Sequence, residues 1–219
     1  MYTQRLVDVD SNDVRRQWAE RSGAYSPEYY AHYGPNETSD VIRRTLERFA
    51  DQSTPILELG YSSGRHLSHL YEHGFENLAG IEVNEEAFDV MEETYPDVAT
   101  CGEFYLDAIE DVVGDFADDQ FGAIYSVETL QHLHPDAEWV FEELARVTDD
   151  LLIVAENEGE ADRTQSTEPD VNYVDDEFPL YYRNWSEIFT ERGFDEVASE
   201  PGKRNTVRTF RTASNRTDR

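Results

Sequence analysis

Two acidic residues and a glycine-rich turn are the parts of this chain that could do chemistry. Glu58 interrupts a short apolar run, and the turn after it carries Gly60 and Gly64. Glycine at these places allows a positive φ or a close approach of the backbone to a ligand. A second acid, Glu82, ends the next apolar run. Because a carboxylate beneath such a turn is costly without a partner, we expect a polar or cationic ligand there.

Alternating apolar runs and helical patterns must position these residues. Strands are predicted at about 55–60, 78–83, within 98–106, 121–127 and 151–156, and a final hairpin over 194–200 and 206–212. Helices are predicted at 11–22, 36–51, between the glycine turn and Gly74, and at 85–95, 137–147 and 185–192. This alternation predicts a doubly wound α/β fold. Its mostly parallel, seven-stranded sheet should carry helices on both faces and an antiparallel C-terminal hairpin.

The domain organisation follows from where this pattern begins and ends. Residues 1–35 are predicted to form a helical and aromatic extension, 36–212 the main domain, and 213–219 a frayed tail. Residues 157–183 interrupt the alternation as an irregular insertion. The segment 25–35 holds four tyrosines and two prolines, and it either packs on the main domain or covers a ligand. The packing alternative is favoured.

The composition is strongly acidic. The chain has 48 Asp and Glu against 18 Lys and Arg, a net charge of −30, and its one lysine is Lys203. Such a surface repels nucleic acid and anionic membranes at long range, so neither is expected as a partner. The composition resembles that of proteins from salt-loving archaea. We therefore interpret the charge as a halophilic adaptation to the solvent.

The single cysteine, Cys101, excludes an internal disulfide and fits a reducing interior, where we expect it to be a small buried residue. No apolar run approaches the roughly 20 residues that cross a membrane. The first residues show no signal-peptide core. A cytoplasmic location is therefore predicted.

The six histidines raise the question of a metal site. His66, His69 and His73 share one side of a predicted helix, but they should lie on its flank or outer side, and no metal is predicted. His132 and His134 follow the fourth strand. For His134 a capping or packing role is favoured. For His132 this role and that of a general base stay open.

The segment ELGYSSG, followed by GIEVN, resembles the class I S-adenosylmethionine-dependent methyltransferases, which have a Rossmann-like fold. Their first motif is an acid followed by glycines at alternating positions, and here Ser62 replaces the middle glycine. The resemblance extends over about 36–156 and, less closely, through the C-terminal hairpin. It implies S-adenosyl-L-methionine as the cofactor.

The same resemblance implies roles for individual residues. Glu58 would lie near the methionine ammonium, and Glu82 would accept hydrogen bonds from both ribose hydroxyls. The methionine and ribose would pack on the backbone of Gly60, Tyr61, Ser62 and Gly64. Val83, Asp107, Ala108 and Ile109 would surround the adenine, and Val127 would lie beside the methionine. The segment around Asp107 can be shifted, so that Glu103 or Glu110 could serve in its place.

The implied activity is methyl transfer to an unidentified acceptor, for which a small molecule bound between 25–35, 128–135 and 157–183 is favoured. Methyl transfer requires mainly alignment of its reactants, and no catalytic residue is named beyond the candidate His132. The alternatives are a cofactor-binding subunit without catalysis, an aminopropyl transferase, and an NAD-dependent oxidoreductase, whose G-x-G-x-x-G order is absent here. The oligomeric state is left open.

Overall fold

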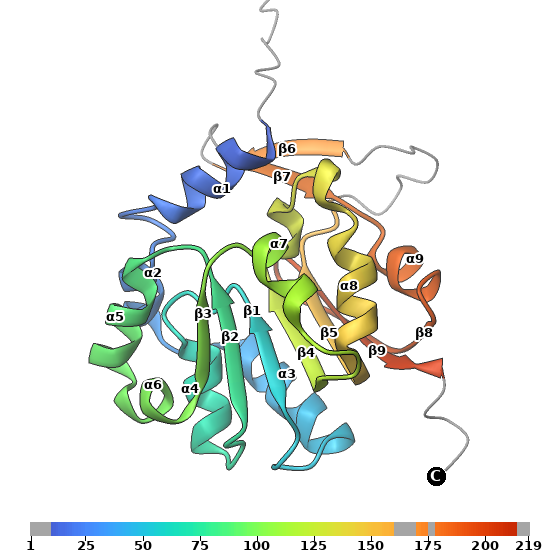
Figure 1. Ribbon diagram of the computed structural model, residues 1–219, viewed down its shortest axis with the longest axis horizontal. Helices are drawn as coiled ribbons and strands as arrows, with labels where there is room; N and C mark the ends of the chain where they lie inside the picture. The colour runs from blue at the N-terminus through green and yellow to red at the C-terminus, as the bar shows by residue number, and fades with distance from the viewer. Residues whose placement is uncertain (1–9, 160–169, 175–177, 214–219) are drawn as a thin grey trace, which may run out of the picture.

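A seven-stranded sheet of order β3-β2-β1-β4-β5-β9-β8 forms the centre of the molecule (Figure 1). The computed structural model describes residues 10–159, 170–174 and 178–213. The strands are β1 Ile56–Leu59, β2 Leu78–Glu82, β3 Glu103–Leu106, β4 Phe121–Val127, β5 Thr148–Glu156, β8 Phe194–Pro201 and β9 Thr206–Thr212. The first five are parallel, and β9 pairs antiparallel with both β5 and β8. The predicted fold class is confirmed.

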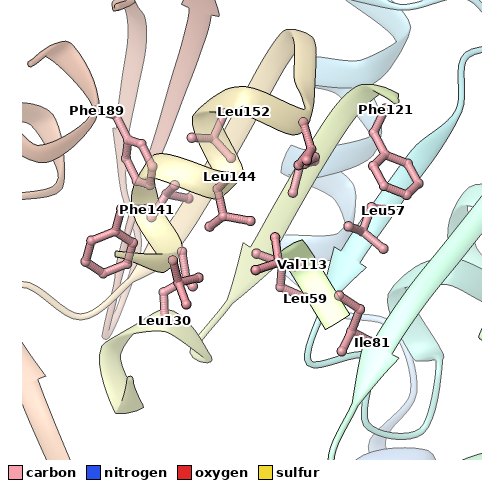
Figure 2. Packing of buried hydrophobic residues seen from close by; sticks show 14 of the residues in the cluster. Leu57, Leu59, Ile81, Val113, Phe121, Leu130, Phe141, Leu144, Leu152 and Phe189 are labelled. Atoms are coloured by element: carbon pink, nitrogen blue, oxygen red, sulfur yellow. The ribbon is translucent and has the colours of Figure 1, made fainter. Parts of the chain in front are cut away.

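The two faces of the sheet are covered by different helices. One face packs on α3 Glu37–Phe49, α4 Arg65–Glu72, α5 Glu86–Thr94 and α6 Pro96–Cys101. The other packs on α7 Ile109–Val112, α8 Val140–Val147 and α9 Trp185–Thr190. Figure 2 shows the cluster of buried hydrophobic residues on this face. Every residue of β1 is buried, as expected for a parallel strand with both faces covered. Glu58 shares its face with Ile56 and therefore points toward the side of α4.

Strand order reverses at β1, which pairs with β2 on one side and with β4 on the other. Ligands of open α/β sheets bind outside the carboxyl ends of the strands at such a switch point. Two further units lie at this end: the helices α1 Ser11–Ala19 and α2 Pro27–Tyr33, and a separate sheet of β6 Asp170–Val174 and β7 Phe178–Tyr182. The Trp18 ring of α1 lies 4.9 Å from the Phe178 ring of β7.

Several boundaries differ from the prediction. The predicted helix 85–95 ends at Thr94, and Pro96 opens α6, which was not predicted. Proline stops a helix that precedes it, but it also fits the first turn of a new one. The irregular insertion 157–183 is wrong in its second half, where β6 and β7 pair. The tail 214–219 and residues 1–9 lie outside the described residues.

Two side-chain predictions were wrong. Cys101 is exposed rather than buried, because it ends the short helix α6. His66 is buried rather than on the outer side of α4, because its Nδ1 lies 2.8 Å from the Ser39 hydroxyl of α3. In the part of the chain that the structure describes, no helix is long and apolar enough to cross a membrane.

Candidate functional site

A cavity opens above the carboxyl ends of β1, β2, β3 and β4. Most of the residues predicted to hold a cofactor line it, namely Gly60, Tyr61, Ser62, Glu82, Val83, Asp107, Ala108, Ile109 and Val127. Residues from α1, α2 and the segment after β4 complete the wall. The fold thus brings together segments that are far apart in the sequence.

The glycine turn takes its shape from left-handed backbone conformations. Gly60 and Gly64 have φ of 72° and 74°, and Ser62 between them has φ of 48°. Ser62 therefore keeps the conformation that a glycine would adopt, at a cost of roughly 1–2 kcal/mol for a residue with a Cβ. Its N–H donates to Glu82 Oε2 at 2.8 Å, which ties the turn to the end of β2. The departure from the family motif at Ser62 leaves the turn intact.

Glu82 is held in one orientation by backbone donors. Its Oε1 accepts from the N–H groups of Val83 at 2.8 Å and Asn84 at 3.0 Å, and its Oε2 accepts from that of Ser62. Burial raises the pKa of Glu82, and these three hydrogen bonds oppose that shift. Carboxylate oxygens have about four acceptor sites between them, so a fixed acceptor remains at the cavity wall.

Glu58 and Gly64 do not line the cavity. Glu58 lies under the turn with 1% exposure, and its Oε2 accepts from the Tyr125 hydroxyl at 2.9 Å. Its Oε1 has no hydrogen-bond partner among the described residues, and burial raises the pKa of this carboxyl well above its usual range. Gly64 precedes α4 as its N-cap. An orphaned buried acceptor close to the turn fits a ligand with hydrogen-bond donors at this place.

The three acids considered for the adenine end have different surroundings. Asp107 is exposed at the cavity, with Oδ1 accepting from the Ala108 N–H at 2.8 Å. Glu110 is engaged by Arg15 Nε at 3.0 Å, and Glu103 lies outside the cavity lining. Of the three acids, it is therefore Asp107 that lines the cavity and forms no ion pair within the described residues.

Glu156, at the end of β5, was missed by the sequence analysis. Its Oε1 accepts from the N–H groups of Thr129 at 3.2 Å and Leu130 at 3.0 Å, and its Oε2 from that of Gln131 at 3.2 Å. The Ser126 hydroxyl also donates to it. Burial raises the pKa of Glu156 to about 7. This carboxylate fixes the segment after β4 that lines the cavity.

His132 is a positioning residue in this arrangement. Its Nδ1 lies 2.8 Å from the Pro179 carbonyl oxygen, which can only accept, so Nδ1 carries the proton. The other nitrogen, Nε2, then accepts from the Gln131 amide at 3.2 Å. The Trp18 ring packs 4.6 Å from the imidazole. The nitrogen that a general base would use is thus already engaged.

We expect His132 to stay neutral over the physiological range, because burial lowers its pKa to about 4. An NMR titration of the imidazole resonances should give a midpoint near pH 4. His132→Asn serves to assign the resonance. A midpoint at or above the usual value of about 6.5 would show that His132 is free to act as a base.

The N-terminal helices pack on the domain and also line the cavity. The packing role favoured for 25–35 is therefore only part of what this segment does. Tyr25 and Tyr30 line the cavity together with Trp18 of α1. The Asn84 amide holds the end of α1 by donating to the carbonyl oxygens of Trp18 and Arg21. The N-terminal helices therefore form part of the cavity wall.

Gly60→Ala should weaken ligand binding while leaving the protein folded. A Cβ at Gly60 would clash with the Thr129 side chain, on a backbone whose φ of +72° disfavours any side chain. We expect at least a tenfold loss of S-adenosylhomocysteine affinity by calorimetry. Gly114→Ala is the matched control, because a Cβ there meets nothing within 4 Å. Equal affinities of the two variants would contradict the assignment of the turn.

Groups of three or more potential metal ligands are absent among the residues that the structure describes. His66 bonds Ser39, His69 lies 3.2 Å from Asp40, and His73 Nδ1 bonds the His69 carbonyl at 2.7 Å. Each of the three histidines therefore has its own contact with another residue.

The sheet order, the glycine turn after β1 and the acid that ends β2 define the class I S-adenosylmethionine-dependent methyltransferases. Residues 57–150 match a family described as "Methyltransferase domain". The sequence has no significant match among curated proteins.

Solved structures extend the similarity over most of the chain. The magnesium protoporphyrin IX methyltransferase of Synechocystis PCC 6803 with bound SAH gives a TM-score of 0.66 at 12% identity, covering 93% of this chain and 100% of that chain. SpnF, a 4+2 cyclase, gives 0.63 at 13%, covering 89% and 85%. The 1,6-didemethyltoxoflavin-N1-methyltransferase of Burkholderia thailandensis, with 1,6-didemethyltoxoflavin and S-adenosylhomocysteine bound, gives 0.61 at 14%, covering 80% and 77%. At these identities the likeness establishes the fold.

Proposed function

We propose that this S-adenosylmethionine-dependent methyltransferase acts on a small molecule and binds its cofactor in the cavity above β1, β2, β3 and β4. The observation that carries the site assignment is the fixed carboxylate of Glu82 at the wall beside the glycine turn. Two of the similar structures, those named for magnesium protoporphyrin IX and 1,6-didemethyltoxoflavin, are methyltransferases with small-molecule acceptors in their names.

The residues present fit the cofactor. Glu82 would hold the ribose hydroxyls, Asp107 and Ile109 would border the adenine, and the backbone of Gly60 would border the methionine. Glu58 would attract the methionine ammonium from beneath the turn, directly or through water. When bound, S-adenosylmethionine supplies a methyl group on a positively charged sulfur, which passes to a nucleophile while sulfur keeps the bonding electrons. The protein's part is to align the two and to exclude water.

The surroundings we propose are a cytoplasm of high salt. The net charge of −30 makes the surface self-repelling at low ionic strength. Binding measurements therefore belong in molar KCl.

The direct test is calorimetry of the purified chain with S-adenosylmethionine, S-adenosylhomocysteine and NAD. We expect both sulfur ligands to bind and NAD to give no signal. Binding of NAD alone would replace the proposal with an oxidoreductase. Binding of both sulfur ligands without turnover of any tested acceptor would favour a cofactor-binding protein without methyl transfer, and SpnF shows that a cyclase can have this fold.

A further inference from the structure

A second cavity adjoins the cofactor cavity and is not explained by cofactor binding. It lies between α2 and the turn that joins β8 to β9, and its volume is about 670 Å³. This lies within the range of small-molecule pockets, roughly 300–1,000 Å³. We call it the acceptor chamber. Its lining includes Tyr29, Tyr33, Lys203 and Asn205, none of which lines the cofactor cavity.

The two cavities meet along one edge. The residues that line both are Tyr25, Tyr30, Arg65, Val127, Glu128 and Arg204. Val127 ends β4, where the methionine end of the cofactor is proposed to lie. A molecule in the acceptor chamber would therefore present its reacting atom across this edge.

One wall of the acceptor chamber is aromatic. Tyr25, Tyr29, Tyr30 and Tyr33 line it from α2 and the residues before it. Tyr29 is the centre of this wall, with its ring centroid 5.6 Å from Tyr25, 5.3 Å from Tyr30 and 4.9 Å from Tyr33. Tyr33 is 64% exposed, so its ring is available to a ligand. Aromatic walls of this kind favour flat, apolar bodies.

Several charged side chains line the acceptor chamber, and some of them contact a partner. Lys203 lies 3.2 Å from Glu37, and Glu128 Oε1 accepts from the Asn205 amide at 3.4 Å. Glu200 also lines the chamber and is exposed.

Arg65 and Arg204, on the shared edge, form no ion pair within the described residues. Arg65 lies over the Tyr30 ring, 4.5 Å from its centroid, and its Nη1 donates to the Gly34 carbonyl oxygen at 3.4 Å. In a chain with 48 acids and 18 cations, guanidinium groups left without a carboxylate at a cavity edge are available for an anion from outside.

We propose that the methyl acceptor is a flat aromatic acid, with its ring against the tyrosine wall and its carboxylate on Arg204 and Arg65. The aromatic wall would select the body of the molecule, and the two arginines would select its negative group. The proposal rests on the methyltransferase function and adds the chemical class of its substrate.

The test uses ligands that share one ring and differ in charge. The full chain, saturated with S-adenosylhomocysteine in molar KCl, is titrated with 6-hydroxy-2-naphthoic acid, its amide and the corresponding aminomethyl compound. The acid should bind at least about tenfold more tightly than the amide, the gain expected from charge-assisted hydrogen bonds. The cationic compound should bind least. Equal or tighter binding of the amide or the amine, or no binding of the acid, would overturn the proposal.

Variants assign the effect to the arginine. Arg204→Gln should weaken binding of the acid about tenfold and leave that of the amide unchanged. Arg44→Gln, an exposed arginine of α3 outside both cavities, is the matched control. Unchanged affinity for the acid in Arg204→Gln would overturn the assignment. Affinity for S-adenosylhomocysteine is measured in the unaltered chain and in the same variants. If the unaltered chain does not bind S-adenosylhomocysteine, the methyltransferase proposal itself is contradicted. If it does bind, a wrong result with the acid contradicts only the proposal about the acceptor.

Discussion

Replacing Glu82 with alanine should weaken binding of S-adenosylhomocysteine by at least about a hundredfold. A hydrogen bond from a ribose hydroxyl to the remaining acceptor site of this carboxylate is worth roughly 1.5–3 kcal/mol, and about 2.7 kcal/mol corresponds to a hundredfold. The loss also frees the N–H groups of Ser62, Val83 and Asn84, which Glu82 now satisfies. Calorimetry in molar KCl measures the change.

A graded pair of variants separates the ribose contact from the shape of the turn. Glu82→Gln keeps the size of the side chain but removes its charge and one acceptor oxygen, so an intermediate loss of about tenfold is expected. Glu85→Ala, an exposed acid three residues further along, should bind normally. If Glu82→Ala folds and binds with unchanged affinity, the ribose lies elsewhere.

The strands β1, β2, β4 and β5 could be predicted because each is a separate apolar run with an acid or a glycine at its end or directly after it. Burial of both faces imposes such runs on parallel strands, and β4 was predicted with its observed bounds at 121–127. The hairpin of β6 and β7 was missed because its first strand, DVNYV, is short, carries two polar residues, and has no buried residue among 171–174. Its contacts are with residues far away in the chain, namely the Trp18 ring of α1 and the His132 imidazole, whose Nδ1 donates to the Pro179 carbonyl oxygen.

Some residues of the site could be predicted and others could not, for the same reason. Residues at strand ends, such as Glu82 and Val127, were predicted because the carboxyl ends of parallel strands meet at one edge. The roles that depend on partners far away in the sequence were not predicted. His66 is buried through Ser39, 27 residues earlier in the chain. Glu156 does end a predicted strand, as Glu82 does, and the same rule applied to β5 would have found it.

Removing the carboxylate of Glu156 should have the largest effect on stability. Glu156→Ala leaves three backbone N–H groups of 129–131 and the Ser126 hydroxyl without their buried acceptor. Each unsatisfied group costs roughly 1–3 kcal/mol, and after partial relaxation we expect a loss of about 3–5 kcal/mol in the free energy of unfolding. Urea denaturation in molar KCl measures it. Glu93→Ala, on the exposed side of α5, should change stability little.

The pH dependence of Glu156→Gln identifies the carboxylate as the titrating group. The folded pKa of Glu156 is raised from 4.5 to about 7, so between these values the unfolded chain releases a proton that the folded protein keeps. Stability from this group is therefore present below pH 4.5 and falls as the pH rises to about 7, by about 3 kcal/mol. Glu156→Gln lacks this fall, so the stability gap between the unaltered chain and the variant should narrow over that window. His132 changes stability in the opposite direction between pH 4 and 6.5, but it does so in both proteins and cancels from the difference. A gap that widens with rising pH would mean that the folded protein favours the ionised carboxylate, and that the N–H groups of 129–131 outweigh the cost of burial.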